Sequence, residues 1–207
     1  MKDEIALIVI DVVNGCCAKE CETPDYGITF TKIREMVPRL EKFIGEYRER
    51  VNRNVFMVNL TPWTAEYLPE NIRKLYENPE ICYYGDGGFE EEFYAIKPAS
   101  SDKVITKNTY DAFMGTELDK LLRERGVREI VVAGVFTDGC VLSTIINGFS
   151  RGYNFTMLRD LVETTDLPVR RRLQEDLLEY TLPMQYGKVL LSGDFLDSGL
   201  FNAGDGG

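Results

Sequence analysis

The sequence predicts an α/β protein whose parallel sheet carries helices on both faces. Short apolar, strand-like runs alternate along the 207 residues with segments in which apolar side chains recur every three or four residues. This alternation favours a parallel sheet, because parallel neighbours need a crossover connection, which is usually a helix. No repeat, low-complexity segment or linker marks a second domain, so residues 1–207 are expected to form a single domain.

The expected elements follow one another along the whole chain. Buried strand-like runs cover residues 5–10, 55–60, 103–106, 128–134, 154–158 and 188–191. Helical spacing covers residues 31–50, 65–76, 116–125, 139–150 and 168–180. Residues 15–28 and 83–101 lack periodicity, and long irregular loops in α/β domains are often functional. The Gly-rich tail, residues 192–207, is expected to be mobile or to lie at a subunit contact.

Charge and cysteine content restrict the partners and the compartment. The net charge is −10 and the pI is about 4.7, and such a surface repels nucleic acid and anionic lipid. The apolar runs are too short to span a bilayer, and the N-terminus shows no signal peptide pattern. The chain has five cysteines, an odd number, which is not typical of a protein stabilised by disulfides. We therefore expect a cytoplasmic protein with a small-molecule substrate and no nucleic-acid or membrane partner.

The absence of histidine restricts the chemistry. The chain has no histidine at all, which excludes Ser-His-Asp and Cys-His catalysis and every zinc site that needs a histidine. A catalytic base must then be a carboxylate, a lysine or a tyrosine. No cofactor and no metal are expected.

Three polar residues lie at the carboxyl ends of expected strands. Asp11 ends the first strand, Lys107 ends the third, and Cys140 follows the fourth after a short turn. Ligands of open parallel sheets bind outside these strand ends, at the point where the strand order reverses. The three side chains are therefore expected to meet there as a catalytic group.

Cys140 is the expected nucleophile. It lies on a strand–turn–helix elbow, where the partial positive charge of the helix N-terminus lowers a thiol pKa and stabilises an oxyanion. Lys107 would favour the thiolate further, and Asp11 could take up the thiol proton and pass it to a leaving amine. The alternative is structural, because a lone cysteine in an apolar helix is usually a small core residue.

Other polar and aromatic residues have simpler interpretations. The turn residues Thr137 and Asp138 are expected to hold the turn through side-chain to backbone hydrogen bonds. Residues 170–172, three arginines in the last long helix, are expected to form a solvated face. Aromatic residues expected either to line a substrate pocket or to belong to the core are Trp63, Tyr110, Phe113 and Phe136.

The remaining cysteines could be a metal or redox cluster or incidental packing thiols. Cys16, Cys17, Cys21 and Cys82 contain no paired C-x-x-C spacing, which favours packing.

Three segments resemble the isochorismatase-like cysteine hydrolases. The resemblance runs from about residue 4 to residue 192, and its segments are Ala6–Asp11, Asp102–Phe113 and Val131–Val141. It implies a three-layer α/β/α, Rossmann-like fold with a six-stranded, mostly parallel sheet, and a homodimer or larger homo-oligomer. Asp11 would be the general acid and base, Lys107 the electrostatic support and Cys140 the nucleophile.

The resemblance also implies a particular turn before Cys140. A cis peptide bond between Val135 and Phe136 would turn the backbone N–H of Phe136 toward the oxyanion. The backbone N–H groups of Phe136 and Cys140 would then form the oxyanion hole.

The chain departs from the family pattern in two places. After Asp11, many members read Met-Gln-Asn-Asp-Phe, whereas this chain continues Val-Val-Asn-Gly-Cys. The nicotinamidase branch binds a metal through Asp and His residues after the second strand, and residues 59–63, Asn-Leu-Thr-Pro-Trp, contain neither. The substrate is therefore open, and nicotinamide is not favoured.

The sequence predicts a metal-independent cysteine hydrolase that cleaves a small amide or carbamoyl C–N bond through a thioester on Cys140. One alternative is isochorismatase-type vinyl-ether hydrolysis, which needs no thiol nucleophile. Another is a non-catalytic binding protein on the same fold, because fold alone does not decide function.

Overall fold

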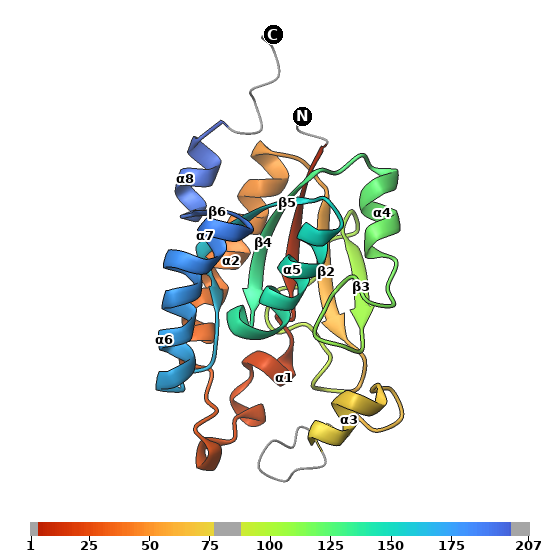
Figure 1. Cartoon of the computed structure of the whole chain (residues 1–207), viewed down its shortest axis with the longest axis vertical. Helices are drawn as coiled ribbons and strands as arrows, with labels where there is room; N and C mark the ends of the chain where they lie inside the picture. The colour runs from red at the N-terminus through yellow and green to blue at the C-terminus, as the bar shows by residue number, and fades with distance from the viewer. Residues whose placement is uncertain (1–3, 77–87, 200–207) are drawn as a thin grey trace.

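A computed structural model describes residues 4–76 and 88–199 of the chain. Its centre is a six-stranded sheet with the order β3-β2-β1-β4-β5-β6, in which every neighbouring pair is parallel (Figure 1). The strands are β1 (Ile5–Ile10), β2 (Val55–Leu60), β3 (Lys103–Lys107), β4 (Glu129–Val135), β5 (Asn154–Glu163) and β6 (Gly187–Leu190). The predicted α/β fold with a six-stranded sheet is confirmed.

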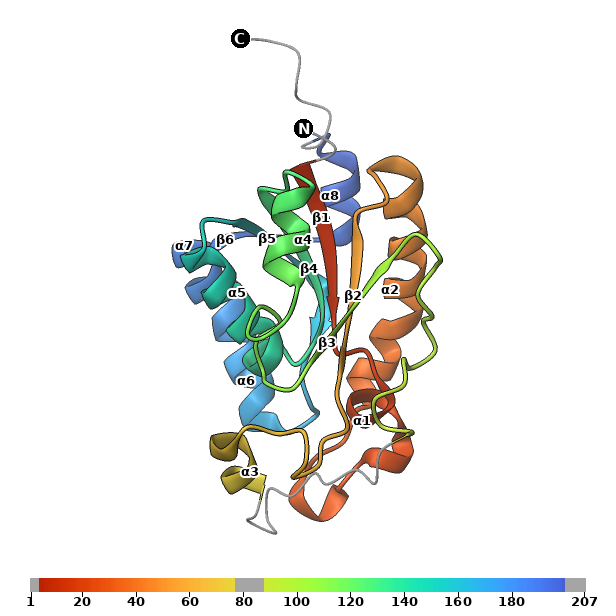
Figure 2. The same cartoon turned by 90° about the vertical axis from the view of Figure 1, so that its right-hand side faces the viewer.

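Helices cover both faces of the sheet (Figure 2). Longer helices are α2 (Thr31–Arg50), α3 (Glu70–Tyr76), α4 (Leu118–Glu124), α5 (Leu142–Ser150) and α6 (Pro168–Asp176). Short helices are α1 (Asn14–Cys17), η2 (Lys19–Cys21), η3 (Pro24–Tyr26), α7 (Leu182–Gln185) and α8 (Ser192–Asp197). Two π-helical turns are η4 (Thr137–Val141), before α5, and η5 (Leu177–Thr181), between α6 and α7. No helix among the described residues is long and apolar enough to cross a membrane.

The two faces of β1 belong to two different hydrophobic cores. Leu7 and Val9 pack in the core that contains the apolar face of α2, whereas Ala6 and Ile8 face the core beneath α4 and α5. Side chains alternate between the faces of a strand, so a central strand with helices on both sides must be apolar at every position. All six residues of β1 are buried, which explains its uninterrupted apolar run.

Most expected boundaries agree with the structure, and the differences have physical causes. The expected helix at 65–76 begins only at Glu70, soon after Pro69. β5 runs five residues beyond the expected end, with a register shift against β4 between Val132 and Gly134. Residues 15–28 contain short helices instead of an irregular loop. Of the expected loop at 83–101, residues 83–87 lie outside the described part.

The first part of the tail packs on its own chain. Phe195 and Leu196 of α8 are buried, and the Phe195 ring lies 6.2 Å from Phe43 and 6.4 Å from Tyr47 of α2. Arg50 also donates a hydrogen bond to the Leu196 carbonyl oxygen at 2.9 Å. Residues 192–197 are therefore not a mobile tail, because two apolar side chains complete the core against α2, whereas a subunit contact of the tail stays a prediction. Residues 200–207 lie outside the described part.

Residues 90–94 support the carboxyl edge of the sheet. Residues 90–94 run beside residues 12–15, with hydrogen bonds from the Asn14 N–H to the Glu92 carbonyl oxygen (2.8 Å) and from the Tyr94 N–H to the Val12 carbonyl oxygen (2.9 Å). Because these bonds begin immediately after Asp11, they fix the chain where it leaves β1.

Candidate active site

The structure brings Asp11, Lys107 and Cys140 into contact. Lys107 Nζ lies 2.7 Å from Asp11 Oδ2 and 3.4 Å from Cys140 Sγ, and it also donates to the Thr109 carbonyl oxygen at 2.9 Å. Asp11, Lys107 and Cys140 are only 0%, 2% and 8% exposed. The predicted convergence of these three residues is therefore present in the folded chain.

Strand order and local backbone geometry produce this contact. β1 lies between β2 and β4, and β3 pairs with β2, so the carboxyl ends of these strands share one edge. Asp11 follows β1 with a left-handed backbone (φ 53°), and its N–H donates to the Val58 carbonyl oxygen of β2. Gly134 of β4 lies directly against Ile10, where a Cβ atom would collide with the Ile10 carbonyl oxygen. Glycine at this position therefore allows β4 to approach β1 immediately before the site.

Asp11 is a buried carboxyl group with room to accept a proton. Burial raises its pKa, and the adjacent Lys107 ammonium and Cys140 thiol oppose this increase. Apart from the ion pair with Lys107, neither carboxylate oxygen has a well-formed hydrogen bond among the described residues. Such a group fits a proton acceptor that later returns the proton.

The surroundings of the Cys140 thiol oppose the lowering of its pKa that a helix N-terminus favours. Burial and the negative charge of Asp11 raise its pKa to about 12, against the opposing effect of Lys107. Cys140 precedes α5 within the π-helical turn, and Gly139 beside it is non-helical (φ −130°, ψ −107°). This direction favours a site in which a neighbouring base removes the thiol proton during the reaction.

Lys107 remains a cation. Burial alone would lower its pKa, but the neighbouring Asp11 carboxylate and Cys140 thiol raise it above the ordinary lysine value. This direction suits an electrostatic partner rather than a proton donor.

The turn before Cys140 is held by another helix. Arg170 of α6 donates to the Asp138 carboxylate through Nε at 2.7 Å and through Nη2 at 2.6 Å. Thr164 Oγ1 donates to the same carboxylate at 2.6 Å, and Thr137 Oγ1 donates to Gln174 Oε1 at 3.0 Å. The expectation that Thr137 and Asp138 bind backbone groups is corrected, because their partners are side chains from another part of the chain.

The expectation of a solvated arginine face on α6 is also wrong for two of the three residues. Arg170 forms the ion pair with Asp138, and its guanidinium lies 4.8 Å from the centre of the Phe136 ring. Arg171 pairs with Glu163 of β5, and only Arg172 is fully exposed. The helix follows β5 directly, so its first turn faces the turn before Cys140.

Two of the four aromatic residues that were expected in a pocket or in the core lie together. The Trp63 and Tyr110 rings are 6.3 Å apart, and Tyr110 packs both on the small cluster of Trp63 and on the core that contains Cys140. Phe113 instead stacks on Tyr153 at 5.7 Å and contacts Gly148, about two helical turns beyond Cys140. The geometry of Phe113 is that of a core residue.

The other cysteines form no metal cluster in residues 4–76 and 88–199. No group of three or more His, Cys, Asp or Glu residues in these ranges could hold a metal ion. Cys16 and Cys17 are buried in α1, Cys21 is partly exposed, and all three thiols are free. Burial raises the pKa of each of them. Cys82 lies outside the described residues.

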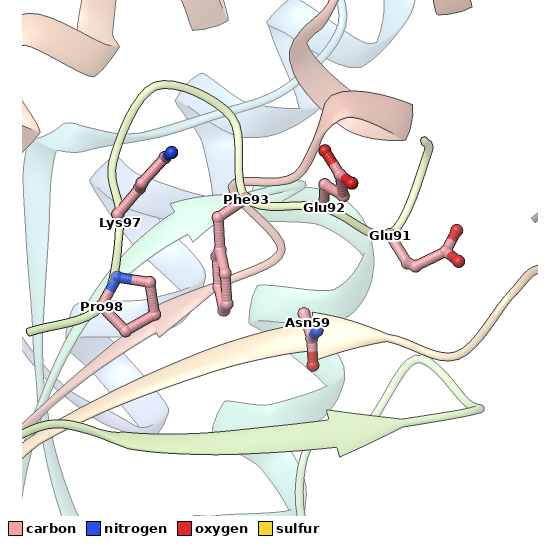
Figure 3. A pocket seen from close by; sticks show the side chains of 6 residues that line it. All are labelled: Asn59, Glu91, Glu92, Phe93, Lys97 and Pro98. Atoms are coloured by element: carbon pink, nitrogen blue, oxygen red, sulfur yellow. The ribbon is translucent and has the colours of Figure 1, made fainter. Parts of the chain in front are cut away.

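A hollow of about 670 Å³ lies apart from this site (Figure 3). Asn59 of β2 and the segment at 91–98 line it, and Asn59 accepts a hydrogen bond from Thr106 Oγ1 at 2.8 Å. Because neighbouring residues of a strand point to opposite faces, Thr106 and the hollow lie on the other side of the sheet from the Lys107 amine. Its described lining residues are Asn59, Glu91, Glu92, Phe93, Lys97 and Pro98.

The expected cis peptide bond is present. Val135 and Phe136 are joined by a cis bond, immediately before the turn that carries Cys140.

Several characterised proteins are similar to this chain. Ureidoacrylate amidohydrolase RutB from Variovorax paradoxus is 28% identical over 170 residues, which cover 75% of this chain and 67% of that protein. Its counterpart from Acinetobacter baylyi is 27% identical over 173 residues, with 76% and 70% covered.

Solved structures with the same fold extend the comparison. A cysteine hydrolase from Pseudomonas syringae pv. phaseolicola has a TM-score of 0.80 at 24% identity, with 95% of this chain and 92% of that chain covered. N-carbamoylsarcosine amidase from Thermoplasma acidophilum has a TM-score of 0.68 at 25% identity, with 91% and 96% covered. Residues 5–173, most of the chain, match the isochorismatase domain. This chain, with its six-stranded parallel sheet and its buried Asp11, Lys107 and Cys140, therefore belongs to the isochorismatase family.

Proposed function

We propose that this chain is a hydrolase that cleaves the C–N bond of a small amide or carbamoyl compound through a thioester on Cys140. The observation that carries the proposal is the buried contact of the Lys107 ammonium with both the Asp11 carboxylate and the Cys140 sulfur. Ureidoacrylate amidohydrolase and N-carbamoylsarcosine amidase, named above as relatives, both act on bonds of this class, and this supports the proposal.

The first half of the reaction forms the thioester. Asp11 takes the thiol proton of Cys140 as sulfur attacks the carbonyl carbon, and the carbonyl oxygen becomes an oxyanion. The backbone N–H groups of Phe136 and Cys140 stabilise this oxyanion. Asp11 then gives its proton to the nitrogen, so that a neutral amine leaves and the acyl group remains on sulfur.

The second half releases the acid. Water enters the position of the departed amine. Asp11 takes a proton from this water while the water oxygen attacks the thioester carbonyl. The C–S bond breaks, sulfur regains a proton from Asp11, and the carboxylic or carbamic acid leaves. Lys107 stays protonated throughout and stabilises the negative charge that passes between the carboxylate and the sulfur.

The two raised pKa values are consistent with this proton circuit. Burial and the Asp11 charge raise the pKa of the Cys140 thiol, so its attack is helped by proton transfer to a base in contact with it. Asp11, whose pKa burial also raises, is a stronger base than an exposed carboxylate. The circuit needs no metal, and the donor set of the site, with one carboxylate, one ammonium and one thiol, does not suit one.

The substrate pocket is assigned to the Trp63 and Tyr110 side of the site. Tyr110 connects the Trp63 cluster to the core around Cys140, so these rings would close one side of the acyl site. Two bulky rings at this point favour a compact substrate rather than a peptide.

We also infer a cytoplasmic homodimer or larger homo-oligomer. The four described cysteines are free, which suits a reducing compartment. The oligomer is an expectation from family resemblance, and size-exclusion chromatography with light scattering measures it directly.

The test is a panel of small amides, ureas and carbamates assayed for ammonia or amine release. The wild-type chain should release amine from at least one of them, and intact mass should show an acyl adduct on Cys140 when deacylation is slowed. Folded variants with Cys140→Ala, Asp11→Asn or Lys107→Ala should lose nearly all turnover. Turnover of a true substrate by the Cys140→Ala variant would contradict the covalent mechanism and favour vinyl-ether chemistry. A wild-type chain with an unreactive Cys140 would favour the binding-protein alternative.

A further inference from the structure

The residues that hold the turn before Cys140 have no role in the proton circuit described above. They are Asp138, Thr164, Arg170 and Gln174, and we call them the turn-support cluster. Their contacts reach three consecutive residues of the turn: the Phe136 ring, the Thr137 hydroxyl and the Asp138 carboxylate. The next residues are Gly139 and Cys140, so this cluster is the nearest tertiary support for the nucleophile on its N-terminal side.

The cluster is buried and specific in geometry. The Asp138 side chain is only 6% exposed, and Arg170 binds both of its oxygens in a planar, two-point contact. Burial opposes ionisation of Asp138, but the hydrogen bonds from Arg170 and Thr164 outweigh it and lower the pKa of the carboxyl group. An ionised carboxylate held by three donors is a rigid anchor for the backbone that carries it.

The local backbone needs such an anchor. The turn is π-helical, and Gly139 departs from helical geometry, so regular helix hydrogen bonds alone do not determine its shape. The N–H groups of Gly139 and Val141 both donate to the Phe136 carbonyl oxygen, at 2.9 Å and 3.2 Å, and these bonds are local. The contacts from α6 and Thr164 add the long-range constraint.

We propose that Asp138 and Arg170 are positioning residues for the oxyanion hole, with Thr164 and Gln174 in support. This inference rests on the proposed function, because it assigns the backbone N–H groups of Phe136 and Cys140 to the oxyanion. None of the four side chains forms a hydrogen bond or ion pair with Asp11, Lys107 or Cys140 among the described contacts. They act on where the turn lies, not on the protons. Displacing a catalytic donor by about 1 Å reduces a rate by about 100-fold.

Two reactions of the same sulfur separate this role from general structural support. Acylation of Cys140 by p-nitrophenyl acetate passes through an oxyanion, whereas alkylation by iodoacetamide is a direct displacement that forms none. Both need the thiol and its base. Loss of the turn-support cluster should therefore slow acylation and leave alkylation nearly unchanged.

The experiment compares Arg170→Met with Arg172→Met in the full chain. Arg172 lies on the exposed side of the same helix, so its variant is the matched control for charge and size. We expect Arg170→Met to slow acylation of Cys140 by about 10- to 100-fold and to change alkylation by less than about 3-fold. Arg172→Met should leave both rates unchanged. Circular dichroism and urea unfolding at the assay temperature establish that each variant is folded.

Further variants keep the test decisive if Arg170→Met does not fold. Asp138→Asn retains the shape of the side chain, and Arg170→Lys retains the charge without the two-point contact; both should give a smaller loss of acylation in the same direction. The double variant Asp138→Asn/Arg170→Met should lose no more than the worse single variant, because both changes break one contact.

The outcomes distinguish the positioning role from the proposed function. Equal acylation-to-alkylation ratios in the wild-type, Arg170→Met and Arg172→Met chains would overturn the positioning role. The proposed hydrolase function would still stand if the wild type released amine from an amide substrate. A parallel loss of acylation and alkylation would assign the cluster to general support of the thiol, and it would also overturn the proposal. Failure of wild-type Cys140 to be acylated at all, checked against Cys140→Ser, would refute the nucleophile assignment itself.

Discussion

Replacement of Lys107 by methionine should destabilise the chain in a pH-dependent way. The change keeps the apolar length of the side chain but removes the ammonium that lies 2.7 Å from Asp11 Oδ2. Both side chains of this ion pair are at most 1% exposed, so the Asp11 carboxylate would be left as an uncompensated buried charge. Removal of one partner of a buried ion pair costs about 3–5 kcal/mol of unfolding free energy.

The pH dependence follows from the direction of the Asp11 pKa. Burial already raises this pKa, and Lys107 opposes the increase, so the Lys107→Met variant raises it further. A carboxyl group whose pKa is higher in the folded state holds its proton more tightly there. The variant therefore loses stability as the pH rises above the unfolded-state pKa of about 3.9, by at most about 1.4 kcal/mol per pH unit. Its deficit relative to the wild type should therefore be larger at pH 8 than at pH 4.

Urea unfolding at pH 4, 6 and 8, followed by circular dichroism, measures this deficit. The double variant Asp11→Asn/Lys107→Met carries no charge at this position and should recover part of the stability with a flatter pH profile. Lys74→Met, which removes an exposed partner of Glu70, is the surface control and should change little. An unfolding midpoint for Lys107→Met that equals the wild type at pH 8 would refute the argument, because the ion pair would then not be buried and coupled as the structure has it.

Three further predictions concern the site. The rate of Cys140 alkylation by iodoacetamide should rise with pH between pH 7 and 9, because burial and the Asp11 charge raise the pKa of the thiol; a rate that is flat over this range would indicate a resting thiolate. Turnover, measured as amine release, should persist after dialysis against a chelator, with metal content followed by elemental analysis. Loss of tightly bound zinc together with activity would refute the metal-free mechanism. Trp63→Ala should extend turnover to bulkier amides. Phe113→Leu should lower the urea midpoint of unfolding without changing the preferred substrate size, because Phe113 packs against Gly148 and Tyr153. Equal substrate profiles in both variants would argue against a pocket at Trp63.

Two features of the site were not predicted from the sequence. The ion pair of Asp138 with Arg170 joins a turn residue to the first turn of a helix 32 positions later. A carboxylate beside the expected nucleophile and a run of three arginines in a chain with an acidic surface were the available signals, but no local spacing connects them. The direction of the Cys140 pKa shift is the second such feature, because the pKa of a thiol depends on how deeply the fold buries it and on which charge lies nearest.

The layered fold and the identity of the three central residues follow from the order of the amino acids along the chain. Apolar runs such as Ile5–Ile10 are buried on both faces, so the alternation of strands and helices is encoded locally by hydrophobic spacing. A charged residue at the buried end of such a run lowers stability unless it is paired or functional, which is why Asp11 and Lys107 could be singled out. The folded chain was needed to show which groups touch, that Phe113 packs in the core, that α8 packs on α2, and that α6 supports the turn before Cys140. These features depend on strand order and on side-chain contacts between distant segments, and those are set by packing of the whole chain rather than by any local pattern.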